Sequence, residues 1–274
     1  MDSITPLAGR KKIQEKRFVN NLISFKKINM NDILTKSLAQ IVNSNHRAAM
    51  VFEKYHLDFC CKGKRTLQQA CIESELPVDE ILAELDKTQQ QSSDKVTINF
   101  NNLSLSILTE YIVSTHHEYV KKEMPAIAQY LQKIAAKHGE RHPEMRKVLQ
   151  VFTAVKEEME LHMKKEETVL FPRIKELEKH QMAGIQPPIN IAYLKSPIIM
   201  MEQEHDHAGA ALAAIRQLTA NYNSPTDACT TYRLSFVALE AFELDLHQHV
   251  HLENNILFPK ALKLFNDAGG YSLN

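Results

Sequence analysis

The chain has 274 residues, of which 44% are hydrophobic, and its 33 basic side chains balance its 33 acidic ones. This length allows one or two domains with a hydrophobic core. The balanced charge disfavours nucleic acid and anionic membranes as partners, because both select basic surfaces. No segment approaches the roughly 20 apolar residues of a membrane span. The 4 cysteines are too few for a disulfide framework in a chain of this length, which predicts a cytoplasmic protein.

The N-terminal part divides into three segments by composition. Residues 1–30 are rich in lysine and arginine, and we expect a disordered extension or a true start at Met30. Residues 31–87 are predicted to form a small helical domain, in which Thr66 is the N-cap of a helix. Residues 88–98 are polar and low in complexity, which indicates a linker.

Residues 99–266 are predicted to form an antiparallel four-helix bundle. Apolar residues recur there with helical spacing along four long segments. Ser196 and Pro197 are expected to be the N-cap and first-turn residues of the third helix. The expected helices span about 104–137, 143–179, 197–220 and 227–265. The predicted fold class is therefore all-α, a four-helix bundle preceded by a small helical domain.

One motif occurs twice in the predicted bundle, at residues 162–172 and 249–259. Each copy has a histidine, a glutamate four residues later, and Leu-Phe-Pro beginning eight residues after the histidine. A single such His/Glu pair is common on helices without a metal, but a duplicated pair is not expected by chance. Both pairs lie on apolar helix faces. Because a carboxylate buried without a partner costs several kcal/mol, Glu166 and Glu253 need a cation.

The first and third helices are expected to supply two more imidazoles. The apolar stripe of the first helix passes through His116 or His117, and the spacing favours His117, which precedes His162 by 45 residues. His205, on the stripe of the third helix, precedes His249 by 44. This pseudo-two-fold plan indicates an internal duplication. Four imidazoles and two carboxylates suit iron better than Ca²⁺ or Mg²⁺.

The other histidines are assigned lesser roles. Those beside the ligand positions are expected to lie on other faces, with supporting or surface roles: His116, His207, His247 and His251. Those outside the apolar stripes are expected at the surface: His46, His56, His138, His142 and His180.

The adjacent cysteines Cys60 and Cys61 are the second chemical signal. They lack the C-x-x-C spacing of redox or zinc motifs, but Lys62, Lys64 and Arg65 would favour a thiolate. The alternative is a buried pair of small apolar residues. The two remaining cysteines are predicted to be structural: Cys71 and Cys229.

Several stretches are distinctive beyond the two motifs. They read YHLDFCCKGK at 55–64, LHMKKEE at 161–167, MEQEHDHAG at 201–209, ACTT at 228–231 and LENNILFP at 252–259. Through them the chain resembles, over residues 32–265, the di-iron proteins that repair iron–sulfur clusters, the RIC family of bacterial stress proteins. Two features depart from the family. Residues 1–30 have no counterpart, and His116 and His207 add imidazoles beside the usual ligands.

The resemblance implies a haemerythrin-like bundle with two non-haem iron ions per chain, and an N-terminal domain that carries the vicinal cysteines. It implies two bridging glutamates and four imidazoles as ligands: His117, His162, Glu166, His205, His249 and Glu253. It also implies a cytoplasmic homodimer that restores iron–sulfur proteins damaged by oxidative or nitrosative stress, by supplying iron.

Two other functions are compatible with the same residues. One is an enzyme that reduces nitric oxide at the iron pair, with Cys60 and Cys61 as catalytic residues that relay electrons. The other is a haemerythrin-like carrier or sensor of oxygen or nitric oxide. Haemerythrins use a fifth imidazole four residues after the third-helix histidine, and here that position is Gly209. The missing imidazole favours iron release or chemistry over protected oxygen binding.

Overall fold

The structure is a computed structural model that describes residues 30–90, 98–185 and 192–267. In these ranges the chain is helical and forms no strand, so the predicted all-α fold class is confirmed. Most of the predicted basic extension and of the predicted linker lies outside the described residues. None of the described helices is long and apolar enough to cross a membrane.

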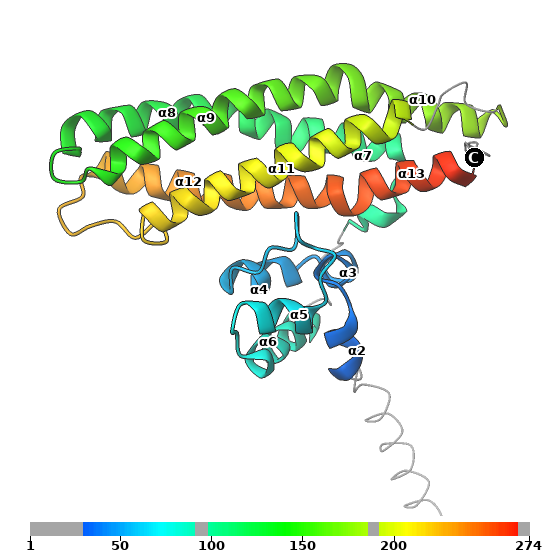
Figure 1. The fold of residues 1–274 in the computed structure, drawn as a ribbon, viewed down its shortest axis with the longest axis horizontal. Coiled ribbons are helices and arrows are strands. Elements are labelled where there is room, and N and C mark those ends of the chain that lie inside the picture. The colour runs from blue at the N-terminus through cyan, green and yellow to red at the C-terminus, as the bar shows by residue number, and fades with distance from the viewer. Residues whose placement is uncertain (1–29, 91–97, 186–191, 268–274) are drawn as a thin grey trace, which may run out of the picture.

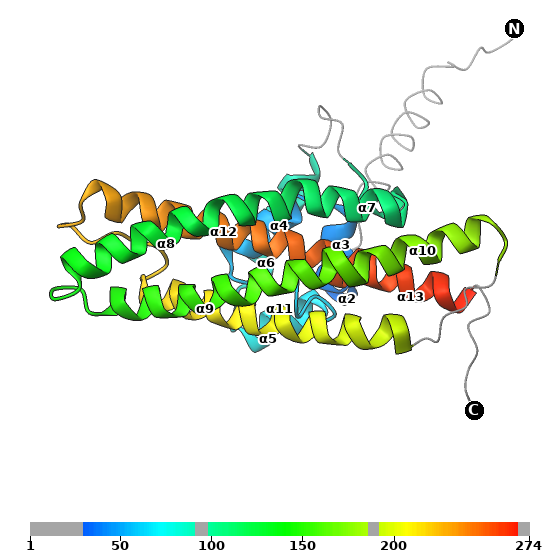
Figure 2. The ribbon, with the colours of Figure 1, turned by 90° about the horizontal axis from the view of Figure 1, so that it is seen from above.

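The described part of the bundle consists of four rods that lie side by side (Figures 1 and 2). α8 packs on α9 and α12, and α9 also packs on α11. Three rods are interrupted by π-helical turns, here named η2, η3 and η4. The bounds in chain order are α7 Leu105–Ile112, η2 Val113–His117, α8 Glu118–His138, α9 Glu144–Lys165, η3 Glu166–Leu170, α10 Phe171–Met182, α11 Ala192–Leu218, α12 Thr230–Leu252, η4 Glu253–Leu257 and α13 Phe258–Asp267.

The first rod begins where two side chains satisfy its free amide groups. Ser104 is the N-cap of α7, and its side chain accepts a hydrogen bond from the Ile107 amide at 3.2 Å. The carboxylate of Glu178, on α10, accepts from the amides of Leu105 at 2.7 Å and Ser106 at 2.9 Å. A carboxylate at a helix N-terminus also interacts favourably with the helix dipole. These contacts fix the first rod against the second.

The third rod begins earlier than expected. Ser196 and Pro197 do not cap it, because α11 starts at Ala192 and Pro197 lies inside the helix. A proline inside a helix cannot donate to the carbonyl four residues before it, here that of Tyr193. Arg173 compensates, since its Nη1 donates to that carbonyl at 2.7 Å and its guanidinium lies 3.6 Å from the centre of the Tyr193 ring.

Two apolar clusters fill the bundle, one on either side of the predicted ligand positions along the rods. One cluster contains Phe152 and Phe242, whose ring centroids lie 5.6 Å apart. The other contains Ile112, Leu170 and Phe258. A ligand placed between two dry clusters is shielded from water, which strengthens its electrostatic interactions.

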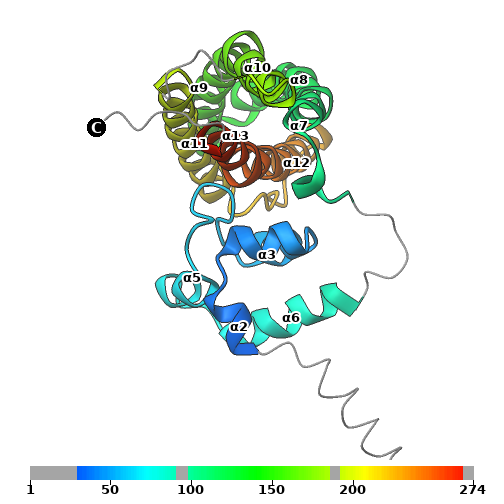
Figure 3. The ribbon, with the colours of Figure 1, turned by 90° about the vertical axis from the view of Figure 1, so that its right-hand side faces the viewer.

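The N-terminal helices form a small unit with its own apolar core. The predicted N-cap at Thr66 is confirmed, because its side chain accepts from the Gln69 amide at 3.1 Å and its amide donates to Oε1 of Gln69 at 3.0 Å. The unit lies against the side of the bundle formed by α11, α12 and α13 (Figure 3). The helices are α2 Met30–Thr35, α3 Leu38–Ser44, α4 Ala48–Lys54, α5 Leu67–Glu73 and α6 Val78–Gln90.

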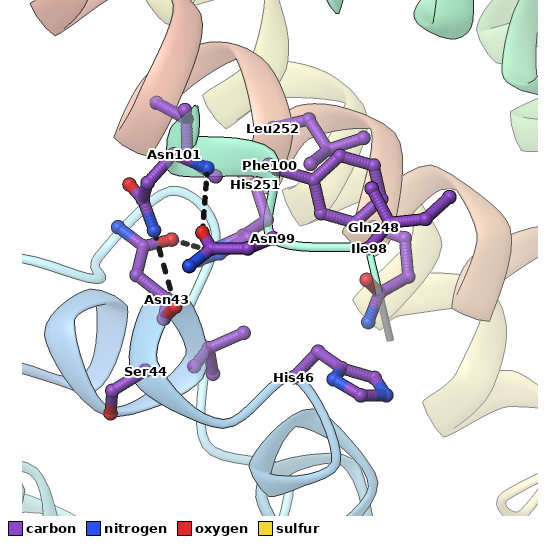
Figure 4. A pocket seen from close by; sticks show the side chains of 12 residues that line it. Asn43, Ser44, His46, Ile98, Asn99, Phe100, Asn101, Gln248, His251 and Leu252 are labelled. Atoms are coloured by element: carbon purple, nitrogen blue, oxygen red, sulfur yellow. Dashed lines mark hydrogen bonds between the residues drawn. The ribbon is translucent and has the colours of Figure 1, made fainter. Parts of the chain in front are cut away.

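A polar contact joins this unit to the bundle around Asn43 (Figure 4). Oδ1 of Asn43 lies 2.9 Å from Nε2 of His251, and its Nδ2 donates to the carbonyl of Asn255 at 3.3 Å. Nδ2 of Asn101 donates to the carbonyl of Asn43 at 3.2 Å. His251 is buried, and burial lowers its pKa to about 4, so it is neutral in this contact.

Candidate metal centre

The π-helical turns coincide with predicted ligand positions. His117 is the last residue of η2, and Glu166 and Glu253 are the first residues of η3 and η4. A π-helical turn inserts a residue into the helix and re-aims the side chains around it, and such turns are frequent at functional sites. The rods thus depart from α-helical geometry where the ligands are needed.

The six side chains predicted as ligands converge in the bundle core. Each of them is exposed by 1% or less. They form two groups whose donor atoms lie within 4.8 Å of one another, the first made by His117, Glu166, His249 and Glu253, the second by His162, Glu166, His205 and Glu253. Both glutamates belong to both groups. This is the arrangement expected of carboxylates that bridge two cations.

Each glutamate contacts one imidazole of each group. Oε2 of Glu166 lies 3.3 Å from Nε2 of both His117 and His162. Glu253 does the same for the other two imidazoles, with each of its oxygens 3.1 Å from an Nε2. The negative charge of each carboxylate is therefore shared between the two groups.

The imidazoles within a group are spaced as two ligands of one ion. The Nε2 atoms of His117 and His249 lie 3.2 Å apart, and those of His162 and His205 lie 3.0 Å apart. With a metal–nitrogen bond of about 2.1 Å, these separations subtend about 90° to 100° at the metal. Adjacent ligands of a six-coordinate ion meet at such angles.

Outer hydrogen bonds orient two of these imidazoles through carboxylates. Nδ1 of His117 lies 2.7 Å from Oε1 of Glu167, and Nδ1 of His162 lies 2.9 Å from Oε2 of Glu204. An acceptor at Nδ1 keeps a proton on that nitrogen and raises the basicity of Nε2, which is then the atom that binds a metal. These two acceptors are half-buried and pair in turn with Lys121 and Lys165.

The other two imidazoles differ from each other. Nδ1 of His205 lies 2.8 Å from the amide oxygen of Asn254. Nδ1 of His249 is buried and has no hydrogen-bond partner among the described residues. Its ring instead stacks on His116, with centroids 5.6 Å apart, and His116 contacts Asp245 at 2.9 Å. The two halves of the duplication therefore support their imidazoles unequally.

The charges of the centre are strongly coupled. Burial and repulsion from Glu253 raise the pKa of Glu166, but His162 and His117 more than offset this and hold the pKa below its ordinary value. Burial lowers the pKa of His162, yet Glu166 and Glu204 raise that pKa to about 10. Burial holds the pKa of His249 below its ordinary value. Burial also raises the pKa of Glu253, but His249 and His205 hold it well below its ordinary value, so both buried carboxylates are ionised.

This donor set fits a pair of cations. Both carboxylate oxygens of Glu166 and Oε2 of Glu253 are buried without a hydrogen-bond partner among the described residues. A buried carboxylate is stabilised only by a counter-charge or by metal coordination. Imidazole and carboxylate donors together are typical ligands of iron.

The structure also shows where the histidines that were not predicted as ligands lie. His117, and not His116, belongs to the first donor group, and His207 is exposed. His46 and His56 are exposed as predicted. His247 and His251 contact the N-terminal unit, and His142 and His180 are half-buried. The surface prediction for His138 is wrong, because this residue is 4% exposed and packs edge-on against Tyr232 at 5.6 Å between ring centroids.

Cys60 and Cys61 lie outside these groups, in the loop between α4 and α5. Both are free thiols, with Cys60 buried and Cys61 half-buried. The expectation that nearby cations favour a thiolate is wrong for Cys60, since its hydrogen bond with Cys61 and its burial raise its pKa well above the ordinary value. Cys71 is buried among the N-terminal helices, which fits a structural role.

Three supporting residues were missed from the sequence: Glu167, Glu204 and Asn254. Glu167 and Asn254 follow the two repeated glutamates directly, so the repeat itself carried a signal. Equivalent residues in a duplicated motif are expected to have equivalent contacts, and both accept from an imidazole Nδ1. Glu204 precedes His205 and lies outside the repeated motif, so the repeat gave no signal for it.

A helical bundle with buried imidazoles and shared carboxylates defines a cation-binding protein of the haemerythrin type. Residues 109–261 match the family described as Hemerythrin HHE cation binding domain, and residues 34–89 match a Domain of Unknown function (DUF542). The chain is 36% identical over 225 residues to the iron–sulfur cluster repair protein YtfE of Enterobacter sp. (strain 638), covering 82% of this chain and 96% of that protein.

Two further relatives carry the same name. The YtfE proteins of Yersinia pestis (strain Pestoides F) and Yersinia pseudotuberculosis serotype O:3 (strain YPIII) are each 34% identical over 234 residues, covering 85% of this chain and 99% of theirs. The chain therefore belongs to the hemerythrin family, together with the iron–sulfur cluster repair proteins.

Proposed function

We propose that this chain is a di-iron protein that repairs iron–sulfur clusters damaged by oxidative or nitrosative stress, by supplying iron. The observation that carries the proposal is the pair of buried glutamates shared by two pairs of imidazoles. The relatives named as iron–sulfur cluster repair proteins support it, because the similarity extends over nearly their whole length.

In this proposal His117 and His249 hold one iron, and His162 and His205 hold the other. Glu166 and its counterpart Glu253, the first residue of η4, would bridge the two ions. Each iron then has two imidazoles and two carboxylates from the protein, fewer than the six ligands of an octahedral ion. When bound, the iron pair supplies ferrous ions and one-electron chemistry. The side chains bind and orient it, and the flanking apolar clusters exclude water.

An oxygen carrier is disfavoured by Gly209. It lies one helical turn after His205, where a fifth imidazole would have to stand. A Cβ added to Gly209 would meet Cys61 Sγ at 3.8 Å, so the N-terminal loop occupies the space beside this position. The open coordination favours release or reaction of iron over protected oxygen binding.

We also propose that the protein acts in the cytoplasm as a homodimer on damaged iron–sulfur proteins. All four cysteines are free thiols, as in a reducing compartment. Molar mass from light scattering of the full chain tests the dimer. A monomeric mass at micromolar concentration would contradict it.

The experiment compares iron content and repair in matched variants. Glu166→Leu and Glu253→Leu should lose the dinuclear iron, measured by metal analysis and Mössbauer spectroscopy, while circular dichroism stays helical. Glu157→Leu is the control, because Glu157 is exposed on α9 away from the centre. Only the wild type and the control should restore activity to a peroxide-damaged iron–sulfur dehydratase. Full iron content in both bridging variants would refute the proposal.

A further inference from the structure

Asp58 holds the loop that carries Cys60 and Cys61 in a fixed conformation. Oδ1 of Asp58 accepts hydrogen bonds from the amides of Cys60 at 3.2 Å, Cys61 at 2.9 Å and Lys62 at 3.2 Å. An aspartate that binds the amides following it fixes a tight turn. Both thiols are therefore placed before any ligand arrives.

The far end of the loop allows no side chain, and a bundle residue anchors its middle. A Cβ at Gly63 would lie 2.2 Å from the Phe59 carbonyl, so only glycine closes this turn. Nδ2 of Asn255, in η4, donates to the carbonyls of Cys60 at 2.9 Å and Phe59 at 3.3 Å. Figure 1 shows the chain between α4 and α5 reaching from the N-terminal helices to the bundle.

The two sulfur atoms have the separation of two ligands on one ion. Sγ of Cys60 and Sγ of Cys61 lie 3.8 Å apart. With a metal–sulfur bond of about 2.3 Å, this separation subtends about 110° at the metal, close to a tetrahedral angle. A carboxylate oxygen of Asp58 lies within 4.8 Å of both sulfurs. Its Oδ1 holds the turn and also accepts a hydrogen bond from Sγ of Cys60 at 3.3 Å.

The thiols face a cavity of about 550 Å³ between the N-terminal unit and the bundle. Asp206 and Gly209 of α11 and His247 of α12 also line it. Asp206 follows His205 directly, Gly209 lies one helical turn after His205, and His247 precedes His249 by two residues, so the cavity lies beside the dinuclear centre along the same two helices. The cavity therefore gives an ion and water access to the thiols from outside the dinuclear centre.

We propose that Asp58, Cys60 and Cys61 form a second metal site, which binds one thiophilic divalent cation, ferrous iron in the working protein. Two thiolates with a carboxylate suit such an ion, and the fourth position remains for water. The assignment to iron rests on the proposed function, because the neighbouring centre handles that metal. Binding replaces two thiol protons, which leave to solvent through the cavity, and the ion keeps its charge state.

The burial of Cys60 supports a bound cation at the proposed site. Cys60 is 4% exposed, and its burial and its neighbouring thiol raise its pKa well above the ordinary value. Without an ion the pair stays protonated, whereas a bound cation supplies the counter-charge for two thiolates. A pair of cysteines that merely filled apolar space would not need to line a cavity together with charged side chains such as Asp58 and Asp206.

The test titrates Co(II), and separately Fe(II), into the metal-free full-length chain without oxygen, and records the thiolate-to-metal absorption in the near ultraviolet. In the wild type this band should reach the intensity of one thiolate-bound ion per chain. The Cys60→Ser/Cys61→Ser double variant should lose it, with unchanged helicity. Cys229→Ser is the matched control and should keep it. Asp58→Asn, which can still hold the turn through its amide oxygen, should weaken binding by about 10-fold or more.

The outcomes separate this site from the dinuclear centre. Glu166→Leu should keep the thiolate band although it loses the bridged ions, which would establish the second site even if cluster repair failed. No band in the wild type, or a band that persists in the double cysteine variant, would overturn the site. A band with Co(II) but none with Fe(II) would overturn the assignment to iron.

Discussion

Glu167 makes the shortest of the outer contacts to the imidazoles, at 2.7 Å from Nδ1 of His117. Glu167→Leu should remove both the acceptor and the charge, so we expect metal affinity to fall by about 10- to 100-fold. Glu167→Gln keeps an acceptor oxygen and should lose less. Competition with a chromophoric chelator measures the affinity, and Glu157→Leu is again the control. Equal affinity in wild type and Glu167→Leu would show that this contact does not support the centre.

Glu243 gives a pH dependence whose sign follows from its burial. It is 4% exposed, its Oε2 accepts from the Tyr222 hydroxyl at 3.0 Å, and Arg216 lies 3.7 Å from its Oε1. Burial raises its pKa above the ordinary 4.5. Above pH 4.5 the Glu243 carboxyl therefore holds its proton more tightly in the folded state than in the unfolded state. The contribution of Glu243 to stability is fully present below pH 4.5 and is lost as the pH rises through the folded-state pKa.

Glu243→Gln should therefore raise the free energy of unfolding at pH 7 by on the order of 1 kcal/mol, since it removes a buried charge that is only partly paired. Near pH 4 the gain should be much smaller, because the wild-type carboxyl is then mostly protonated in both states. Urea unfolding at both pH values measures the difference. A loss of stability at pH 7 would mean that the pair with Arg216 outweighs the cost of burial.

At the scale of single residues, the repeat and the apolar stripes were enough to name the six side chains that converge. Periodicity tells which face of a helix a residue occupies. It does not tell which atom of another helix approaches that face, so Glu204 could not be found in this way. His138 was misplaced for the same reason, because Tyr232 covers it from a different rod.

Among the elements, the start of α11 depends on a contact from another helix. Arg173 supplies the donor that Pro197 cannot give to the Tyr193 carbonyl. Arg173→Ala alone should cost about 1 kcal/mol, as one hydrogen bond and a ring contact are lost. Pro197→Ala should stabilise by about 1 kcal/mol or more, because an amide then closes the helical bond.

The double variant Arg173→Ala/Pro197→Ala tests whether the two residues act on the same helical bond. Once Pro197→Ala restores the helical bond, Arg173 is no longer needed at that carbonyl, so Arg173→Ala should cost less in the variant than in the wild type. Thermal unfolding of the four proteins in the cycle gives the coupling. Additive effects would show that Arg173 acts on α11 by packing alone.

The rods and the all-α class could be predicted from the sequence because the apolar stripes are long and regular. The start of α11 could not, since Ser196-Pro197 has the local signature of a helix start and a distant arginine overrides it. The π-helical turns were also not predictable. Each inserts one residue without breaking the apolar stripe, as at Glu166 and Leu170, which lie at the two ends of η3 and are both buried.

For the whole molecule, the internal duplication predicts how many imidazoles the core receives but not how they are grouped. His117 groups with His249, and His162 with His205, so each group takes one imidazole from each half of the chain. The packing of α8 on α12 and of α9 on α11 decides this. Sequence spacing alone cannot separate it from a grouping within each half, because both have the same intervals.

The same packing connects the N-terminal unit to the centre through η4. Three consecutive residues of this turn point to different partners. Glu253 faces the core, Asn254 holds His205, and Asn255 holds the loop of Cys60. Asn255→Leu should leave two loop carbonyls unpaired, at a cost of about 1–3 kcal/mol for the docked loop.

Hydrogen exchange of the full chain measures this cost by segment. We expect faster exchange in residues 57–65 of Asn255→Leu and unchanged exchange in α9 and α11, because local opening reports only the contacts that hold that segment. Asn101→Ala is the control, since Asn101 touches the N-terminal unit only at the Asn43 carbonyl and not at the loop. If exchange rose equally in the loop and the bundle, Asn255 would stabilise η4 itself. The cysteine loop and the metal centre would then share one folding unit.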